Sequence, residues 1–136
     1  MQKIFLLFFL FIIQSGNAQK VISSKVEKLI IGTWIKKSEQ KRGESENLNI
    51  DCKETIIYYK EGKYSLKNCH GQETGNWKIS ADNKNIVWFN RSNGLGDGEM
   101  FIPIILINNS KLTTSVLFEI EDSIWDEMFE SYIRSK

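Results

Sequence analysis

The sequence has few of the residues that break β-strands and few of those that carry catalysis. Its 136 residues include one proline, one histidine and two cysteines. A single histidine, His70, leaves no histidine cluster for a zinc centre, and no serine lies in a nucleophile elbow. A Cys69–His70 nucleophile–base pair would need a free thiol and an orienting group. We therefore expect no catalytic residue, no metal ion and no cofactor, and interpret the chain as a non-enzyme.

An excess of charge of one sign is also lacking. The chain has 18 basic and 17 acidic residues. Lys3 is the only charged residue among the first 18, so residues 19–136 carry 17 of each sign. A balanced chain has no general attraction to nucleic acid or to anionic membranes. We expect neither as a partner.

Long hydrophobic runs are limited to one, at residues 4–13. It follows Lys3 and precedes small residues at 15–18, which is the pattern of a signal peptide cleaved before Gln19. The run is too short to span a bilayer comfortably, although an uncleaved N-terminal anchor is the alternative. The sequence therefore predicts a signal peptide at 1–18 and one exported domain at 19–136, in the periplasm or outside the cell, with no membrane insertion after cleavage.

The two cysteines, Cys52 and Cys69, both lie beyond the predicted leader. An even number of cysteines in an exported chain favours a disulfide over a reactive thiol. The pair flanks a predicted hairpin with its turn at Glu61-Gly62, so counting outward from the turn brings the two residues close together. We predict a structural Cys52–Cys69 bridge.

Strand-forming residues dominate between the turn signals. The predicted strands are residues 29–37, 54–60, 64–68, 74–80, 85–90, 100–107 and 112–120. Regular short strands at this spacing indicate a sandwich or a barrel, and the short connections favour an antiparallel meander. The fold class predicted is all-β, an eight-stranded antiparallel up-and-down barrel closed by the C-terminal segment.

That last segment allows two interpretations. Apolar residues at 124, 125, 128, 129, 132 and 133 form a helical stripe behind Ser123, a possible N-cap. Seven strands in a meander would leave two open edges, however, so closure favours an eighth strand. We predict a strand at 127–134, with a short C-terminal helix as the alternative.

Two Gly-x-Trp motifs, Gly32-Thr33-Trp34 and Gly75-Asn76-Trp77, each open a predicted strand. Glycine lets the backbone turn or approach another segment closely. A tryptophan two residues later lies on the same face of the strand. We interpret Gly32 and Trp34 as a device that closes one end of the barrel.

Three segments resemble the small exported lipocalin-like domains common in Bacteroidetes: Leu-Ile-Ile-Gly-Thr-Trp at 29–34, Tyr-Tyr-Lys-Glu-Gly-Lys-Tyr-Ser at 58–65 and Glu-Thr-Gly-Asn-Trp-Lys-Ile-Ser at 73–80. The resemblance covers roughly residues 29–120. It implies a lipocalin or calycin barrel, which either holds one small ligand or is filled by its own side chains. In that family pattern a basic residue near the end of the last strand stacks on the first tryptophan. Arg134 is the matching residue over Trp34, with a frayed basic tail as the alternative.

Aromatic residues are the candidates for lining a ligand pocket. They are Tyr59 (or its neighbour Tyr58), Tyr64, Trp77, Trp88, Phe89 and Phe118. Apolar walls with a few polar groups suit a small hydrophobic or amphiphilic molecule. The alternative is that the same residues fill the barrel as core.

Two loops and one strand bear on which partner is expected. The polar segment 38–51 is long enough to be a lid, and Leu95 lies at the tip of a Gly-rich rim loop at 90–99. Asn93, Asp97 and Glu99 of that loop are oxygen donors for a cation such as Ca²⁺, but we interpret the loop as a plain hairpin. Residues 100–107 are apolar on both faces, so a protein-binding module of the inhibitor or immunity type is the alternative function.

Overall fold

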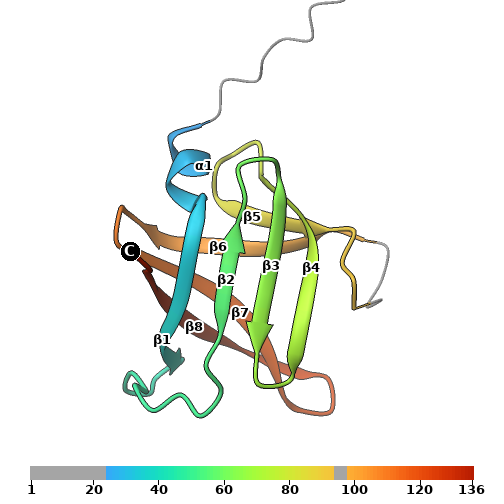
Figure 1. The fold of residues 1–136 in the computed structure, drawn as a ribbon. Helices are drawn as coiled ribbons and strands as arrows, with labels where there is room; N and C mark the ends of the chain where they lie inside the picture. Colours follow the sequence, from blue (N-terminus) through green and yellow to red (C-terminus); the bar gives the residue numbers. More distant parts are fainter. Residues whose placement is uncertain (1–23, 94–97) are drawn as a thin grey trace, which may run out of the picture.

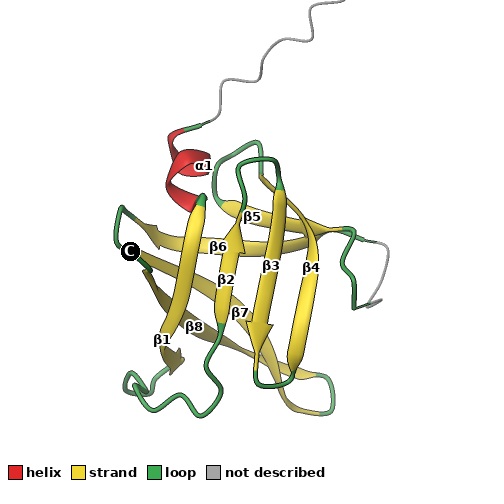
Figure 2. Ribbon diagram, in the orientation of Figure 1, coloured by secondary structure: helices red, strands yellow, loops and turns green. Residues whose placement is uncertain are grey.

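The computed structural model, which describes residues 24–93 and 98–136, is a closed barrel of eight antiparallel strands (Figure 1 and Figure 2). The elements are α1 (Lys25–Ile30), β1 (Gly32–Lys41), β2 (Thr55–Tyr58), β3 (Lys63–Asn68), β4 (Gly71–Ile79), β5 (Asn85–Phe89), β6 (Met100–Ile107), β7 (Lys111–Glu121) and β8 (Ile124–Arg134). The strands pair in sequence order, and β8 returns to pair with β1. The predicted all-β, up-and-down barrel is confirmed. The predicted leader at 1–18 lies outside the described residues.

The C-terminal segment is a strand, so the alternative of a C-terminal helix is wrong. The backbone of β8 pairs with β1 on one side and with β7 on the other. A helix there would leave the facing edges of β1 and β7 without hydrogen-bond partners. Barrel closure therefore outweighs the helical spacing of the apolar residues.

A helix does occur at the other end of the chain, where the sequence predicted a strand from residue 29. The backbone N–H of Glu27 donates to Ser24 Oγ at 3.1 Å, which caps α1. Ile30, at the end of α1, is completely buried, and Val26 packs against the same core. The strand prediction for residues 29–31 is wrong because Leu29 and Ile30 belong to the capped helix, which buries Ile30 over one end of the barrel. We call this the α1 end, and the opposite end, next to residues 42–54, the loop end (Figure 1).

The first Gly-x-Trp motif closes the α1 end. Trp34 is 0 % exposed, and its Nε1 donates to the carbonyl of Ile30 at 2.7 Å. The Arg134 guanidinium lies 4.4 Å from the centre of the Trp34 ring, which is the contact predicted for this pair. It also donates to the carbonyls of Ile31, at 2.7 Å, and of Asn109, at 2.8 Å. The chain is thus held through Arg134, and the alternative of a tail frayed at this residue is wrong.

Gly32 is required at this closure for two reasons. Its φ of +136° lies in a region that other residues rarely adopt. A Cβ atom at this position would also clash with the Nη1 atom of Arg134. The absence of a side chain at Gly32 therefore leaves room for the guanidinium to lie over the Trp34 ring.

The second Gly-x-Trp motif has a different place from the one predicted. Gly75 lies in the middle of β4, which begins at Gly71, and does not open the strand. A Cβ atom on Gly75 would lie 2.7 Å from Cε1 of Tyr64 and 3.0 Å from the carbonyl oxygen of Phe89. This glycine therefore makes room for the Tyr64 ring inside the barrel.

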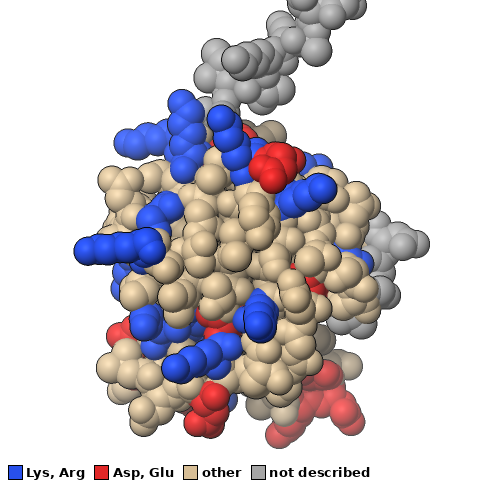
Figure 3. Space-filling model, in the orientation of Figure 1, with Lys and Arg blue, Asp and Glu red and all other residues tan. Residues whose placement is uncertain are grey.

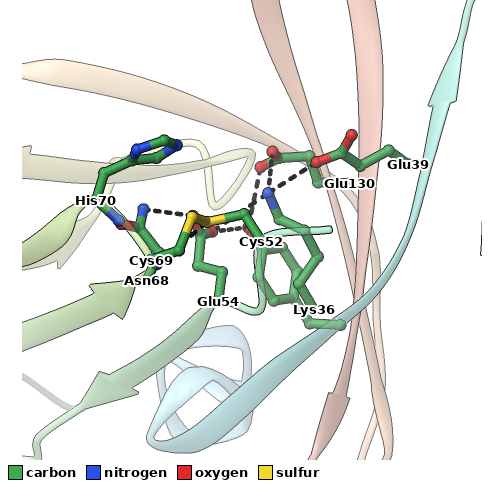
Figure 4. Close-up of polar contacts among 9 residues, drawn as sticks. Lys36, Glu39, Cys52, Glu54, Asn68, Cys69, His70 and Glu130 are labelled. Carbon is green, nitrogen blue, oxygen red and sulfur yellow. Dashed lines mark hydrogen bonds and ion pairs between the residues drawn. A yellow bond between two sulfur atoms is a disulfide. The ribbon is translucent and has the colours of Figure 1, made fainter. Parts of the chain in front are cut away.

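A disulfide joins Cys52 to Cys69, with 5.4 Å between the two Cα atoms. It links the end of the 42–54 loop to the turn between β3 and β4, and Figure 4 shows the bond between the two sulfurs. The predicted pairing of the two cysteines is present. Among the described residues, no helix has both the length and the apolar character needed to cross a membrane.

Removing this bridge with the double replacement Cys52→Ala and Cys69→Ala is expected to lower the free energy of unfolding by about 3 kcal/mol, because the closed loop restricts the unfolded chain. The sequence separation of the two cysteines is 17. Urea titration of the double variant, and of the wild type with and without reductant, measures the loss. A difference below about 1 kcal/mol would show that the bridge is not a major stabilising element.

Candidate functional site

An aromatic layer fills the α1 half of the barrel interior. The rings of Tyr64 and Trp88 stack with their centres 4.3 Å apart. The Tyr58 ring meets Trp77 edge-on at 5.3 Å and lies 6.5 Å from Trp88. All four side chains are buried. At these separations the rings pack on one another and leave no room between them for a ligand.

The predicted lining residues fall into three groups. Tyr64, Trp77 and Trp88 are inside the barrel, in the aromatic layer. Tyr59 is 40 % exposed, because the alternation of side chains along β2 turns its neighbour Tyr58 inward. Phe118 is half-buried on β7, with the Lys41 ammonium 5.1 Å from its ring centre, so it belongs to the loop end. Phe89 is half-buried and, since it alternates with the inward Trp88, lies with Tyr59 outside the interior. The structure does not bring the six predicted residues together in one pocket.

Beyond the aromatic layer, toward the loop end, the interior becomes charged. The Nζ of Lys36 lies 2.6 Å from Glu130, 3.2 Å from Glu39 and 3.5 Å from Glu54. Figure 4 shows these carboxylates converging on the ammonium from different elements. The Tyr132 hydroxyl is 2.7 Å from Glu54 Oε1 and 2.9 Å from Glu130 Oε2. We call Lys36, Glu54, Glu130 and Tyr132 the interior network.

The strand register explains why these side chains meet. Lys36 of β1 pairs directly with Tyr132 of β8. This pair lies two residues along each strand from the Trp34–Arg134 pair, so all four side chains are on the inner face. A bulge in β1 between Lys36 and Ser38 shifts the register and pairs Glu39 with Glu130. Without the bulge, Glu39 would point outward.

Burial sets the protonation of the interior network. The side chains of Lys36, Glu54 and Glu130 are 7, 13 and 13 % exposed. Burial raises the pKa of Glu130 above its usual value, and this outweighs the attraction of Lys36. Burial lowers the pKa of Lys36, but the attraction of Glu130 and Glu54 and the hydrogen bonds to Glu130 and Glu39 outweigh it, so that pKa is raised. Burial thus acts against the charge on Glu130, while the neighbouring carboxylates favour the charged form of Lys36.

The loop end holds a small cavity beside the interior network. Its volume is about 130 Å³, and it is lined by Glu39, Lys41, Glu44, Ser45, Asn47 and Met128. Glu39, Lys41 and Met128 come from the barrel strands. The remaining lining residues belong to the 42–54 loop. Paired backbone hydrogen bonds between Glu39 and Asn47, at 3.1 and 2.7 Å, hold that loop against β1. Part of the predicted lid segment 38–51 thus covers this cavity, while its first residues, through Lys41, belong to β1.

A second polar cluster lies around Glu73 of β4. Arg91 donates to its two carboxylate oxygens at 2.8 and 3.1 Å, and the Tyr64 hydroxyl and the Asn93 amide also donate to it. Burial raises the pKa of Glu73, but hydrogen bonds from Arg91, Tyr64 and Asn93 outweigh it, so the pKa lies below its usual value. This cluster fixes the Tyr64 ring and the start of the 90–99 loop.

Glu73→Gln is expected to lose about 1.5 to 3 kcal/mol of stability at pH 7, because a buried carboxylate with charged hydrogen bonds is replaced by a neutral amide. A carboxylate whose native pKa is lowered stabilises the fold above its unfolded pKa, near 4.5, and this contribution is lost as pH falls through the native pKa. The wild-type and variant stabilities should therefore converge below pH 4.5 in urea titrations. Glu99→Gln, which alters the exposed ion pair with Lys78, is the control expected to change little at either pH. A gap between wild type and Glu73→Gln that does not narrow in acid would contradict the assignment.

Candidate residues for metal binding or catalysis lie as follows. His70 is beside the disulfide, and its ligand atom and the two sulfurs lie within 4.8 Å of one another (Figure 4). Both sulfurs are bonded to each other, so a Cys69 thiolate for a nucleophile–base pair would first require reduction. Of the predicted oxygen donors, Asn93 donates to Glu73 and Glu99 pairs with Lys78. Asp97 and Leu95 lie outside the described residues.

The eight strands pair in sequence order and close through β8 on β1, which is the topology of an eight-stranded up-and-down lipocalin barrel. The barrel is lipocalin-like. Neither a protein-family model nor a curated protein sequence matches the chain. Among solved structures, the chain is similar to a lipocalin-like protein from Bacteroides uniformis ATCC 8492, with 15% sequence identity and a TM-score of 0.47 over 74% of this chain and 96% of that chain.

Sequence reasoning missed the interior network of this lipocalin-like barrel. None of its four residues was among the predicted site residues. The signal that could have found Lys36 is the period of two from Trp34 along β1, and the same period from Arg134 reaches Tyr132 and Glu130. The bulge that turns Glu39 inward has no such signal.

Proposed function

We propose that the chain is an exported, non-catalytic binding protein that holds one small amphiphilic molecule in the loop end of its lipocalin-like barrel. The observation that carries the proposal is the interior network, which lies between the aromatic layer and the loop-end cavity. Burying charged groups costs free energy that an apolar filling would avoid. Perturbed buried groups of this kind cluster at binding and catalytic sites.

The distribution of apolar and polar groups supports an amphiphilic ligand. The aromatic layer is packed and blocks the α1 half of the barrel. Toward the loop end, Met128 lines the cavity and Phe118 lies near it under Lys41. A ligand would place its polar group against the network and its apolar part against these side chains. A wholly apolar ligand would leave the network buried without added hydrogen bonds.

The charges favour a particular polar group on the ligand. Lys36 faces three carboxylates, those of Glu39, Glu54 and Glu130. An ammonium or hydroxyl group on the ligand can donate to these oxygens, whereas a carboxylate would be repelled by them. We therefore expect amines or alcohols to bind better than fatty acids.

The 42–54 loop would act as the lid. The cavity of about 130 Å³ has the volume of about four water molecules in the liquid. A longer ligand therefore requires the loop to move, breaking the backbone pair between Glu39 and Asn47. The disulfide at Cys52 fixes the far end of the loop while its middle opens.

The test is a titration with dodecylamine, dodecanol and dodecanoate, followed by native mass spectrometry and by quenching of tryptophan fluorescence. Dodecylamine is expected to form a 1:1 complex at least about tenfold tighter than that of dodecanoate, the effect of one charged hydrogen bond. Glu130→Gln should weaken the amine complex by about tenfold. Glu119→Gln, on the exposed end of β7, is the matched control and should not. Absence of any 1:1 complex, or equal binding to wild type and Glu130→Gln, would overturn the proposal.

A second candidate function, binding of another protein by an inhibitor- or immunity-type module, is favoured by one specific observation. Large apolar side chains on the outside of β6 to β8 are exposed, including Phe101 at 55 %, Leu117 at 69 % and Trp125 at 58 %. Exposed apolar patches mark interaction surfaces. If the chain binds another protein through this surface, the variant Phe101→Ser should lose that partner. The variant Tyr59→Ser, just after β2, should retain it.

A further inference from the structure

The exposed apolar residues are concentrated on one side of the barrel. Of the eleven large hydrophobic side chains exposed among the described residues, nine lie on β6, β7 and β8. Most of them alternate along their strands with inward side chains such as Ile102 and Tyr132 and so point outward, and Ile105 is exposed at the bulge in β6 between Ile104 and Leu106. The outward set is Phe101, Ile105, Leu106, Leu117, Trp125 and Ile133, and we call the surface they form the β6–β8 face.

The strand register places the apolar residues of the β6–β8 face between polar neighbours on the adjacent strands. Leu106 of β6 pairs with Thr113 of β7, which pairs in turn with Ser131 of β8. Ile133 pairs with Lys111 of β7 on one side and with Ile35 of β1 on the other. Near the middle of β7, Leu117 pairs with Glu127, and closer to the β7–β8 turn Glu119 pairs with Trp125. The apolar residues therefore follow the strands from one end of the barrel to the other.

The two ends of this face carry opposite charge. Glu119, Glu121 and Asp122 are exposed at the turn between β7 and β8, and Figure 3 shows the acidic side chains gathered there. At the α1 end, Lys111 begins β7 and Lys136 follows β8, and both are exposed. Leu117 lies close to the midpoint of β7 between these ends.

We propose that the β6–β8 face binds a second copy of this chain, with the two faces antiparallel about a two-fold axis near Leu117. A surface that is acidic at one end and basic at the other, with exposed apolar side chains between, is complementary to itself when rotated by half a turn. Glu121 of each copy, at the acidic end of β7, then lies near Lys111 of the other. A parallel arrangement would place the acidic ends together and is disfavoured by repulsion.

The size of the face sets the expected strength. β7 has 11 residues, so the face is about 35 Å long, and three strands at their usual spacing make it about 14 Å wide. Two copies would bury roughly 1,000 Å² in total, the lower limit for a specific interface. We therefore expect a dimer that dissociates on dilution through the micromolar range.

Sedimentation equilibrium over a dilution series tests the dimer. Glu119→Lys combined with Glu121→Lys should weaken it by about tenfold or more, because lysines would face lysines across the axis. Adding Lys111→Glu to that variant should restore part of the affinity. Leu48→Ser, at an apolar residue 71 % exposed in the 42–54 loop, is the control and should leave the dimer unchanged.

A cysteine at the axis tests the geometry independently of charge. The chain's two native cysteines are bonded to each other, so Leu117→Cys introduces the single free thiol. It should form a covalent dimer in air without reductant, whereas Leu48→Cys at the same concentration should stay monomeric. A chain that is monomeric at every concentration would overturn the proposal, and so would a dimer indifferent to charge reversal. Binding of a different protein to a monomeric chain at this face would overturn it in favour of the second candidate function.

Discussion

Trp34→Ala is expected to lower the free energy of unfolding by about 3 to 5 kcal/mol, the range for removing a large buried aromatic side chain. Trp34 has no exposed surface, and its indole N–H satisfies the carbonyl of Ile30. The change would also remove the ring that carries the Arg134 guanidinium, a contact worth about 0.5 to 2 kcal/mol. The loss therefore combines a cavity, an unpaired carbonyl and a displaced cation.

Urea unfolding followed by far-ultraviolet circular dichroism measures this loss. The control is Leu48→Ala, which removes an apolar side chain that is already 71 % exposed and should change stability by less than about 0.5 kcal/mol. A loss below about 1 kcal/mol for Trp34→Ala would remove this side chain from the core and with it the account of how the α1 end is closed.

Lys36→Met is expected to cost about 3 to 5 kcal/mol, because it leaves buried carboxylates without their cation. The side chain removed is 7 % exposed and touches Glu130 and Glu54, which are themselves largely buried. Glu130 already has a pKa raised by burial, and loss of the ammonium would raise it further. A carboxyl group whose native pKa is raised favours the folded state at low pH, and that contribution is lost as pH rises through the native pKa. The destabilisation by Lys36→Met should therefore be smaller at pH 4.5 than at pH 7.5, as urea titrations at about these values would show.

The double replacement Lys36→Met and Glu130→Gln separates the ion pair from packing. If the cost of Lys36→Met comes from the unpaired charge, the double variant should regain much of it. If the loss of stability in the double variant equals the sum of the losses in the two single variants, the network stabilises the barrel through packing alone. The electrostatic account of the site then fails.

Much of the fold could be predicted because a strand is indicated by its own residues and by the turn residues that flank it. The strand at Met100–Ile107 was predicted with the observed bounds, and the Gly-x-Trp at 32–34 marked the closed end. The strand at 127–134 was chosen on closure rather than on its own pattern, which resembled a helix. Closure is a property of the whole chain, so it can correct a local pattern.

The interior was harder to predict because it depends on which face each residue takes. Tyr59 was named as a lining residue, yet Tyr58 is the one that points inward, a difference of one position along β2. The Lys36 network required the pairing of β1 with β8, nearly a hundred residues apart, and a bulge after Lys36. Neither follows from the residues near Lys36.

The pairing of β1 with β8 also bears on how the chain folds. Residues next to the α1 end cannot find their final neighbours until Arg134 has been synthesised, since its guanidinium joins the carbonyls of Leu29 and Ile31. Contacts so distant in sequence make folding slow compared with helical domains of similar size. Until β8 has docked on β1, each of these two strands is an exposed edge that could pair with another chain.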